Sequence, residues 1–129
     1  MTTQQQEKRI LIVDDSEDMR ILLEQILEEE EAPYILQFAL DGQQALQKAE
    51  AFQPDLILLD MSLPGISGWD VLPQLKLKPA LAQTPVIAIT AHVSKADQER
   101  ALALGCAVHL GKPFDIETLV DTIKGLLAS

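Results

Sequence analysis

The most constraining feature of this sequence is a regular alternation of short aliphatic runs with longer stretches of helical periodicity. The aliphatic runs occupy residues 10–13, 34–38, 56–59, 86–89 and 107–110, and the second is the weakest. Continuous apolar runs of this length are typical of strands that are covered on both faces. The sequence therefore predicts five strands separated by helices.

The stretches between these runs place apolar residues at the spacing of one helix face. Their stripes are Met19, Leu22, Leu23, Ile26 and Leu27; Ala45, Leu46 and Ala49; Ala101, Leu102 and Leu104; and Ile116, Leu119, Val120, Ile123 and Leu127. A further helix is expected over residues 69–77. Ser16, Ser94 and Asp115 can cap the first, fourth and fifth helices, and Gly105 is well placed to end the fourth. Alternation of this kind predicts an α/β fold with a parallel sheet, right-handed crossovers and helices on both faces.

The length and composition indicate one domain with an aliphatic core. The chain has 129 residues, of which 47% are hydrophobic and 4% are aromatic. This length is that of one ordinary domain, and the hydrophobic content excludes a disordered chain. We expect residues 1–7 to form a disordered N-terminal tail and residues 8–129 to form a single domain.

The charge balance and the apolar runs also exclude several kinds of partner. A formal net charge of −10 repels phosphate backbones, so direct binding to nucleic acid is not expected. The apolar runs are too short to cross a membrane, and the beginning of the chain lacks the apolar core of a signal peptide. Cys106 is the single cysteine, which fits a reducing environment. We therefore expect a cytoplasmic protein that has no membrane partner.

Polar side chains stand at the ends of four predicted strands. Asp14 and Asp15 end the first strand, Asp60 ends the third, Thr90 ends the fourth, and Lys112 follows the fifth. Each aspartate alone could be an ordinary turn or cap residue. In an open α/β sheet, however, ligands bind at the carboxyl ends of the strands, where these groups would meet. The coincidence at four strand ends indicates a functional site.

The residue types in this cluster suit phosphoryl transfer. Three gathered carboxylates would raise one another's pKa values unless a cation lay among them, and an open all-oxygen site suits Mg²⁺. A divalent ion and Lys112 can neutralise the oxygens of a transferring phosphoryl group, and Thr90 can donate its hydroxyl. Asp60 is then left as the nucleophile for in-line attack, with an acyl phosphate as the product.

Four segments resemble the receiver domain of bacterial two-component response regulators of the stand-alone, single-domain type. These segments read Ile-Leu-Ile-Val-Asp14-Asp15-Ser, Leu-Ile-Leu-Leu-Asp60-Met-Ser-Leu-Pro64-Gly65, Ile-Thr90-Ala91 and Lys112-Pro113-Phe114. The resemblance extends over residues 8–127. It implies a flavodoxin-like, doubly wound parallel sheet of five (βα) units, with the strand order 2-1-3-4-5.

The same resemblance implies how the site works. Asp60 would take its phosphoryl group from a histidine kinase or a histidine phosphotransfer protein. Mg²⁺ would be held by Asp15, Asp60 and the backbone carbonyl of Met61, with Asp14 in the inner or the water-mediated shell. The Lys112–Pro113 bond is often cis in this family. The chain would then be a signalling phosphoprotein that catalyses only its own phosphorylation and dephosphorylation, rather than an enzyme.

The expected switch residues include one departure from the family pattern. The family usually carries an aromatic residue three positions before Lys112, where this chain has His109. Thr90 and His109 are the candidate switch residues. His109 either faces solvent or turns inward, and in the second case its charge would make switching pH-sensitive. The resemblance also implies that Ser62 and His92 occupy positions that tune the lifetime of the phosphoryl group.

Four residues near these motifs have purely structural interpretations. Gly65 and Gly68 are expected to serve the turn after the third strand. Trp69 is expected to pack at the surface of the third helix without a functional role. Cys106 lies in an apolar stretch and is interpreted as a small buried hydrophobic residue.

Other functions on related chemistry fit less well. A phosphohydrolase of the haloacid dehalogenase type normally has a second aspartate two residues after its nucleophile, where this chain has Ser62. A flavin-binding protein would need a phosphate loop after the first strand, but the residues there are acidic. The remaining alternative is a receiver-like interaction module that does not depend on phosphorylation.

The output is expected to be a change in a protein-binding surface. The candidate surface consists of the fourth helix, the fifth strand and the fifth helix, because Thr90 and His109 lie at that edge. A downstream protein target would bind there, and a homodimer through the same surface is left open.

Overall fold

The computed structural model describes residues 7–30, 34–91 and 94–128. Strands and helices alternate along the chain, as the sequence predicts. The strands are β1 (Lys8–Val13), β2 (Tyr34–Ala39), β3 (Leu56–Asp60), β4 (Val86–Thr90) and β5 (Val108–Gly111). The helices are α1 (Glu17–Glu28), α2 (Gly42–Phe52), α3 (Gly68–Leu77), α4 (Lys95–Ala103) and α5 (Ile116–Leu127), and a short 3₁₀ helix, η1, spans Pro79–Leu81.

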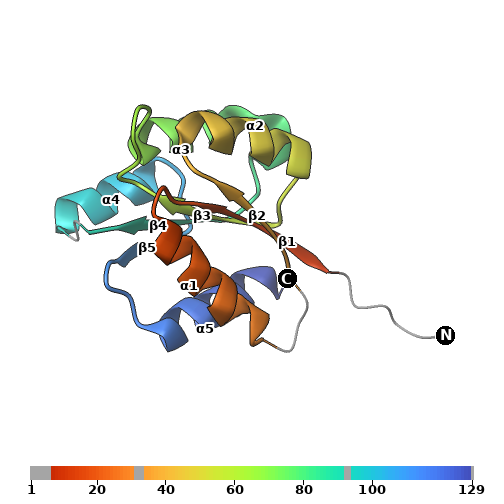
Figure 1. Ribbon diagram of the computed structural model, residues 1–129. Helices are drawn as coiled ribbons and strands as arrows, with labels where there is room; N and C mark the ends of the chain where they lie inside the picture. Colours follow the sequence, from red (N-terminus) through yellow and green to blue (C-terminus); the bar gives the residue numbers. More distant parts are fainter. Residues whose placement is uncertain (1–6, 31–33, 92–93, 129) are drawn as a thin grey trace.

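The five strands form one parallel sheet in the order β2-β1-β3-β4-β5, which confirms the implied order (Figure 1). The pairing is continuous across the centre, where Ile10 lies opposite Leu36 on one side and Leu56 on the other. At the far side, Asp60 pairs with Ile89 and Thr90 pairs with Gly111. All strands run in the same direction, so their carboxyl ends lie along one edge of the sheet.

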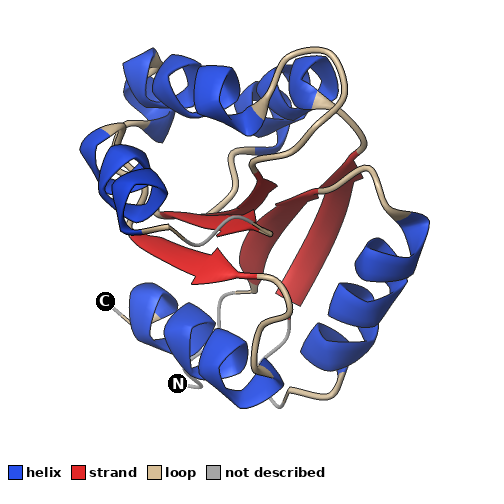
Figure 2. Ribbon diagram, turned by 90° about the vertical axis from the view of Figure 1, so that its left-hand side faces the viewer, coloured by secondary structure: helices blue, strands red, loops and turns tan. Residues whose placement is uncertain are grey.

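Helices cover both faces of the sheet, with α1 and α5 on one face and α2, α3 and α4 on the other (Figures 1 and 2). Successive residues of each strand point to opposite faces, so each central strand contributes to two cores. The side chains facing α1 and α5 include Ile10, Ile12, Leu56, Leu58, Ile87 and Ile89. Those facing the other three helices include Leu11, Val13, Ile57, Leu59, Val86 and Ala88.

The outer strands and the helix stripes are more exposed than the sequence pattern suggests. β1, β3 and β4 are largely buried, whereas β2 and β5 form the sheet edges and are only partly covered. Within the helical stripes, Leu22, Leu102 and Ile116 are exposed. The prediction of burial on both faces was therefore wrong for the two edge strands.

The predicted helix boundaries are confirmed by the hydrogen bonds at their ends. Ser16, Ser94 and Asp115 each accept a hydrogen bond from the backbone N–H three residues later. α4 ends at Ala103, and Gly105, which directly follows the capping residue Leu104, has a φ of +114°. The N–H of Cys106 donates to the carbonyl of Ala101, which closes the helix end as a Schellman motif. Cys106 itself is buried, as predicted.

None of the helices in the described part of the chain combines the length and apolar character that crossing a membrane requires. Because residues 1–6 lie outside the described residues, the division into a tail of residues 1–7 and a domain of residues 8–129 stays a prediction.

Candidate phosphoacceptor site

The carboxyl edge of the sheet brings three aspartates together. Asp14 and Asp15 follow β1, and Asp60 is the last residue of β3. Carboxylate oxygens of all three lie within 4.8 Å of one another. Asp14 and Asp60 are buried, whereas Asp15 is exposed. The cluster is therefore a pair of buried carboxylates with a third carboxylate at the solvent side.

Lys112 lies between the two buried carboxylates. It follows β5, and its backbone N–H donates to the carbonyl of Thr90 at 2.8 Å. Its Nζ donates to Oδ2 of Asp14 and to Oδ2 of Asp60, both at 3.2 Å. The other oxygen of Asp60, Oδ1, accepts a hydrogen bond from the backbone N–H of Ser62 at 2.9 Å. Both oxygens of Asp60 are thus held in defined directions.

In a simple ion pair the pKa of the lysine rises and the pKa of the carboxyl falls, but here the pKa values of both Lys112 and Asp60 are raised. The pKa of Lys112 is raised: burial alone would lower it, but Asp14 and Asp60 outweigh burial. The pKa of Asp60 is also raised, because burial outweighs the hydrogen bond from Ser62 and the charge of Lys112. The difference follows from depth, since the side chain of Asp60 is 5% exposed and that of Lys112 is 23% exposed. The ionised form of Asp60 is therefore less stable in the folded protein than in the unfolded chain.

We expect Asp60→Asn to raise the free energy of unfolding at pH 7 by on the order of 1 kcal/mol. The folded protein binds a proton at Asp60 more readily than the unfolded chain, whose carboxyl has the usual pKa of 3.8. Proton binding at Asp60 therefore stabilises the folded protein. This stabilisation is complete below pH 3.8 and is lost as the pH rises through the raised pKa of the folded state. Urea unfolding between pH 3.5 and pH 7 checks the prediction, which fails if the variant is not more stable at pH 7.

The chain segment after Asp60 is held by the backbone of Met61 and Gly68. The N–H of Met61 donates to the carbonyl of Ile89, and its own carbonyl accepts from the N–H of Gly68 at 3.1 Å. Gly65 has a φ of +73° and serves the turn, as predicted. Gly68 instead begins α3, and a Cβ there would lie 2.5 Å from Cα of Met61. The interpretation of Gly68 as a turn residue was therefore wrong, because its role is close packing.

The two candidate switch residues lie at the β4–β5 side of the site. Thr90 ends β4 and is buried. His109 lies in the middle of β5, where it pairs with Ala88. Its Nε2 is buried and has no hydrogen-bond partner among the described residues. Burial lowers the pKa of His109, while Asp97 acts to raise it. The ring is thus partly turned inward, and its role in switching stays a prediction.

Two side-chain contacts near the site were not anticipated from the sequence. Arg20 on α1 donates from Nη1 to the backbone carbonyl of Asp14 at 3.0 Å. Trp69 is only partly buried, and the guanidinium of Arg100 on α4 lies over its ring at 4.4 Å from the centroid. The first contact spans only six residues and the second joins α4 to α3, but neither leaves a recognisable pattern in the sequence. His92, the second position named for the phosphoryl lifetime, lies outside the described residues.

Comparison with known proteins identifies relatives over nearly the whole chain. The sequence model of a family described as the response regulator receiver domain matches residues 10–124. The polar-differentiation response regulator DivK of Brucella anthropi is 37% identical over 121 residues, which cover 93% of this chain and 96% of that protein.

Solved structures with the same fold include two other response regulators. The chemotaxis response regulator CheY4 of Vibrio cholerae has a TM-score of 0.86 and 30% sequence identity, covering 95% of this chain and 100% of that chain. The Mn²⁺-bound form of the response regulator Rcp1 has a TM-score of 0.78 and 28% identity, covering 92% of this chain and 91% of that chain.

Proposed function

This chain belongs to the response regulator receiver domain family, and we propose that its function is to accept a phosphoryl group on Asp60. The donor is a histidine kinase or a histidine phosphotransfer protein, and the result is a changed surface for a protein target. As a receiver domain the chain is a signalling protein of two-component systems. The residue, the donor and the output surface belong to the proposal.

One observation carries the proposal: Asp60 combines deep burial with contact to Lys112 and proximity to two further carboxylates. Asp60 is 4% exposed, and its Oδ2 lies 3.2 Å from Nζ of Lys112. A buried carboxylate with a raised pKa is a typical property of a reactive group rather than of a surface residue. Its position at the carboxyl edge of the sheet is where open α/β sheets bind their ligands.

The donor set of the cluster fits a hard divalent cation such as Mg²⁺. All three side chains offer carboxylate oxygens within 4.8 Å of one another, and Asp15 leaves one side open to water. Mg²⁺ prefers this kind of site, with a few carboxylates and with water or phosphate as the other ligands. Asp15, Asp60 and the carbonyl of Met61 would hold the ion, with Asp14 in its inner or water-mediated shell. When bound, the ion supplies positive charge to the oxygens of the phosphoryl group. The Mn²⁺-bound form of Rcp1 supports a divalent cation here.

The proposed transfer is an in-line displacement at phosphorus. An oxygen of the Asp60 carboxylate attacks the phosphorus of a phosphohistidine, and the bond between phosphorus and the imidazole nitrogen breaks. The departing imidazole takes up a proton, and Asp60 carries an acyl phosphate. Lys112 can form an ion pair with the new phosphoryl group, because its ammonium group already contacts Asp60. Thr90 can donate its hydroxyl to a phosphoryl oxygen.

The changed surface is proposed to be that of α4, β5 and α5. Thr90 and His109 connect the site to this side of the sheet, and Lys112 leads directly from β5 toward α5. The phosphoryl group adds about −1.5 to −2 charge at neutral pH, which these residues would have to accommodate. The proposal includes a homodimer through the same surface. A change of oligomeric state on phosphorylation would support it.

The chemical nature of the phosphorylated group tests this proposal. We expect incubation with acetyl phosphate and MgCl₂ to label the protein with a phosphate that hydroxylamine removes, because hydroxylamine cleaves acyl phosphates. A phosphate ester on Ser62 or Thr90 would survive the same treatment. A hydroxylamine-stable label would therefore contradict phosphorylation of a carboxylate.

A further inference from the structure

Arg20 reaches from α1 back to the loop that carries the acidic pair. Its backbone N–H donates to the carbonyl of Ser16, as in any helix, but its side chain passes beyond the helix start. There, Nη1 donates to the carbonyl oxygen of Asp14 at 3.0 Å. The side chain is half-buried. This bond spans the turn in which Asp15 lies.

Asp14 is fixed by a hydrogen bond at every polar group that it has. Its N–H donates to the carbonyl of Ala39 at 3.1 Å, and its Oδ1 accepts from the N–H of Ser16 at 2.9 Å. Its Oδ2 accepts from Lys112 at 3.2 Å, and its carbonyl accepts from Arg20. The exposed carboxylate of Asp15, in contrast, accepts no hydrogen bond from the described part of the chain.

The position of the Asp15 carboxylate must therefore come from its backbone. The carbonyl of Asp14 belongs to the planar peptide unit that also contains the nitrogen and Cα of Asp15. A donor that holds this carbonyl fixes the plane from which the Asp15 side chain starts. The side chain of Arg20 holds this peptide unit through its hydrogen bond to the Asp14 carbonyl.

We propose that Arg20 is a positioning residue for divalent-cation binding. By holding the Asp14 carbonyl, it keeps the Asp15 carboxylate within reach of the carboxylates of Asp14 and Asp60. The inference rests on the proposed function, because it concerns the same metal site. Arg20 thus contributes to the affinity for the cation without contacting the cation.

The charge of Arg20, taken alone, predicts the opposite effect on the affinity for a divalent cation. A guanidinium near the cluster repels a divalent cation, so on Coulombic grounds alone its removal would strengthen binding. A role in positioning predicts weaker binding, since loss of a residue that orients a metal ligand lowers affinity about 10- to 100-fold. The sign of the change separates the two effects.

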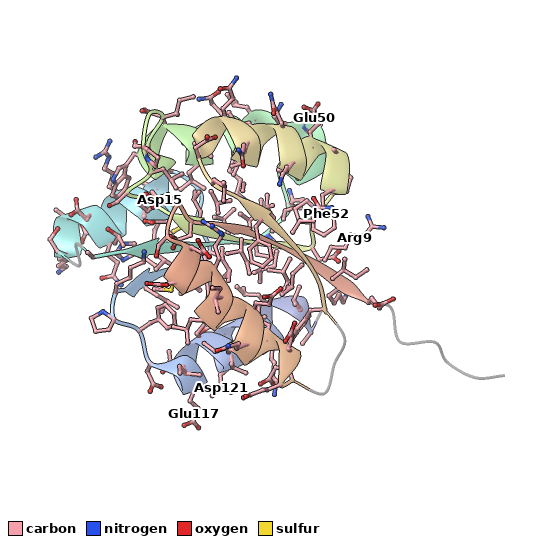
Figure 3. All side chains as sticks on the ribbon, in the orientation of Figure 1. Arg9, Asp15, Glu50, Phe52, Glu117 and Asp121 are labelled. Atoms are coloured by element: carbon pink, nitrogen blue, oxygen red, sulfur yellow. The ribbon has the colours of Figure 1, made fainter. Side chains whose placement is uncertain are left out.

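The test is a titration with MgCl₂ of wild type, Arg20→Met, Arg20→Ala, Arg20→Lys and Arg9→Met, followed by the amide shifts of Asp15 and Met61. Arg9 is a matched control, because its Nη1 also donates to a backbone carbonyl, that of Phe52, at 3.1 Å. Arg9 lies at the other end of β1 from Asp15 (Figure 3). The thermal midpoint of each variant is measured alongside, since a purely structural role would lower the midpoint and leave the affinity unchanged.

We expect Arg20→Met to bind Mg²⁺ about tenfold more weakly than wild type, Arg20→Lys to regain part of the affinity, and Arg9→Met to match wild type. Unchanged or tighter binding by folded Arg20→Met, or by Arg20→Ala if Arg20→Met does not fold, would overturn the role of Arg20 while leaving the metal site intact. Wild-type amide shifts that do not respond to MgCl₂ would overturn the metal site of the proposed function and this inference with it.

Discussion

Gly68→Ala is expected to lower the free energy of unfolding by about 3 kcal/mol, because the new methyl group meets backbone rather than a movable side chain. A Cβ at this position would lie 2.5 Å from Cα of Met61 and 2.8 Å from the carbonyl oxygen of Asp60. Relief requires α3 to move away from the end of β3. We expect the same movement to break the hydrogen bond from Gly68 to Met61, which holds the loop next to Asp60.

Gly125→Ala is the matched control for this prediction. Gly125 lies inside α5, and a Cβ there would have no heavy atom within 4 Å. Alanine in a helix interior is favoured over glycine by about 1 kcal/mol, so this variant should be more stable than wild type. Urea unfolding of the three proteins gives the comparison. Equal stability of Gly68→Ala and wild type would show that α3 can shift without loss and would contradict the close packing described here.

Lys112→Met is expected to lower the free energy of unfolding by about 2 kcal/mol at pH 7. The methionine keeps the apolar stem but leaves Asp14 and Asp60 buried without their shared ammonium group. The loss is smaller than for a fully buried pair, because Lys112 retains contact with solvent. Since burial already raises the pKa of Asp60, the deficit should shrink as the pH falls and the carboxyl becomes protonated.

Two further measurements separate this explanation from a simple loss of packing. Adding Asp60→Asn to Lys112→Met should restore part of the stability, because it removes one of the unpaired charges. MgCl₂ should stabilise Lys112→Met more than it stabilises wild type, because the divalent ion can take the place of the ammonium group. A deficit that is the same at pH 4 and pH 7, and with and without MgCl₂, would indicate that Lys112 acts through packing alone.

The residues at the strand ends could be predicted because the information is local. An aspartate at the end of a strand, like Asp60, or directly after one, like Asp14, places its side chain at the carboxyl edge whatever the order of the strands. The same holds for Lys112 after β5. The strand order itself did not follow from the alternation and came only with the resemblance to receiver domains. The caps of α1, α4 and α5 were predictable for the same local reason.

The contacts that the sequence did not predict depend on how side chains and whole elements pack in three dimensions rather than on a local residue pattern. The bond from Arg20 to Asp14 depends on the reach and direction of one long side chain, and nothing in the spacing of the two residues requires it. The packing of Gly68 on Met61 depends on how closely α3 approaches β3. For His109, the sequence left open two orientations, and the burial of its Nε2 is visible only in the structure.

Intact mass spectrometry after incubation with acetyl phosphate tests the central claim most directly. Asp55 is the matched control, because it is an exposed aspartate just before the opposite end of β3, where it accepts a hydrogen bond from Arg9. Wild type and Asp55→Asn are expected to gain one phosphoryl group in the presence of MgCl₂ and none without it. Asp60→Asn is expected to gain none. An adduct that persists in Asp60→Asn would contradict Asp60 as the acceptor. No adduct on folded wild type would favour a receiver-like interaction module that does not depend on phosphorylation.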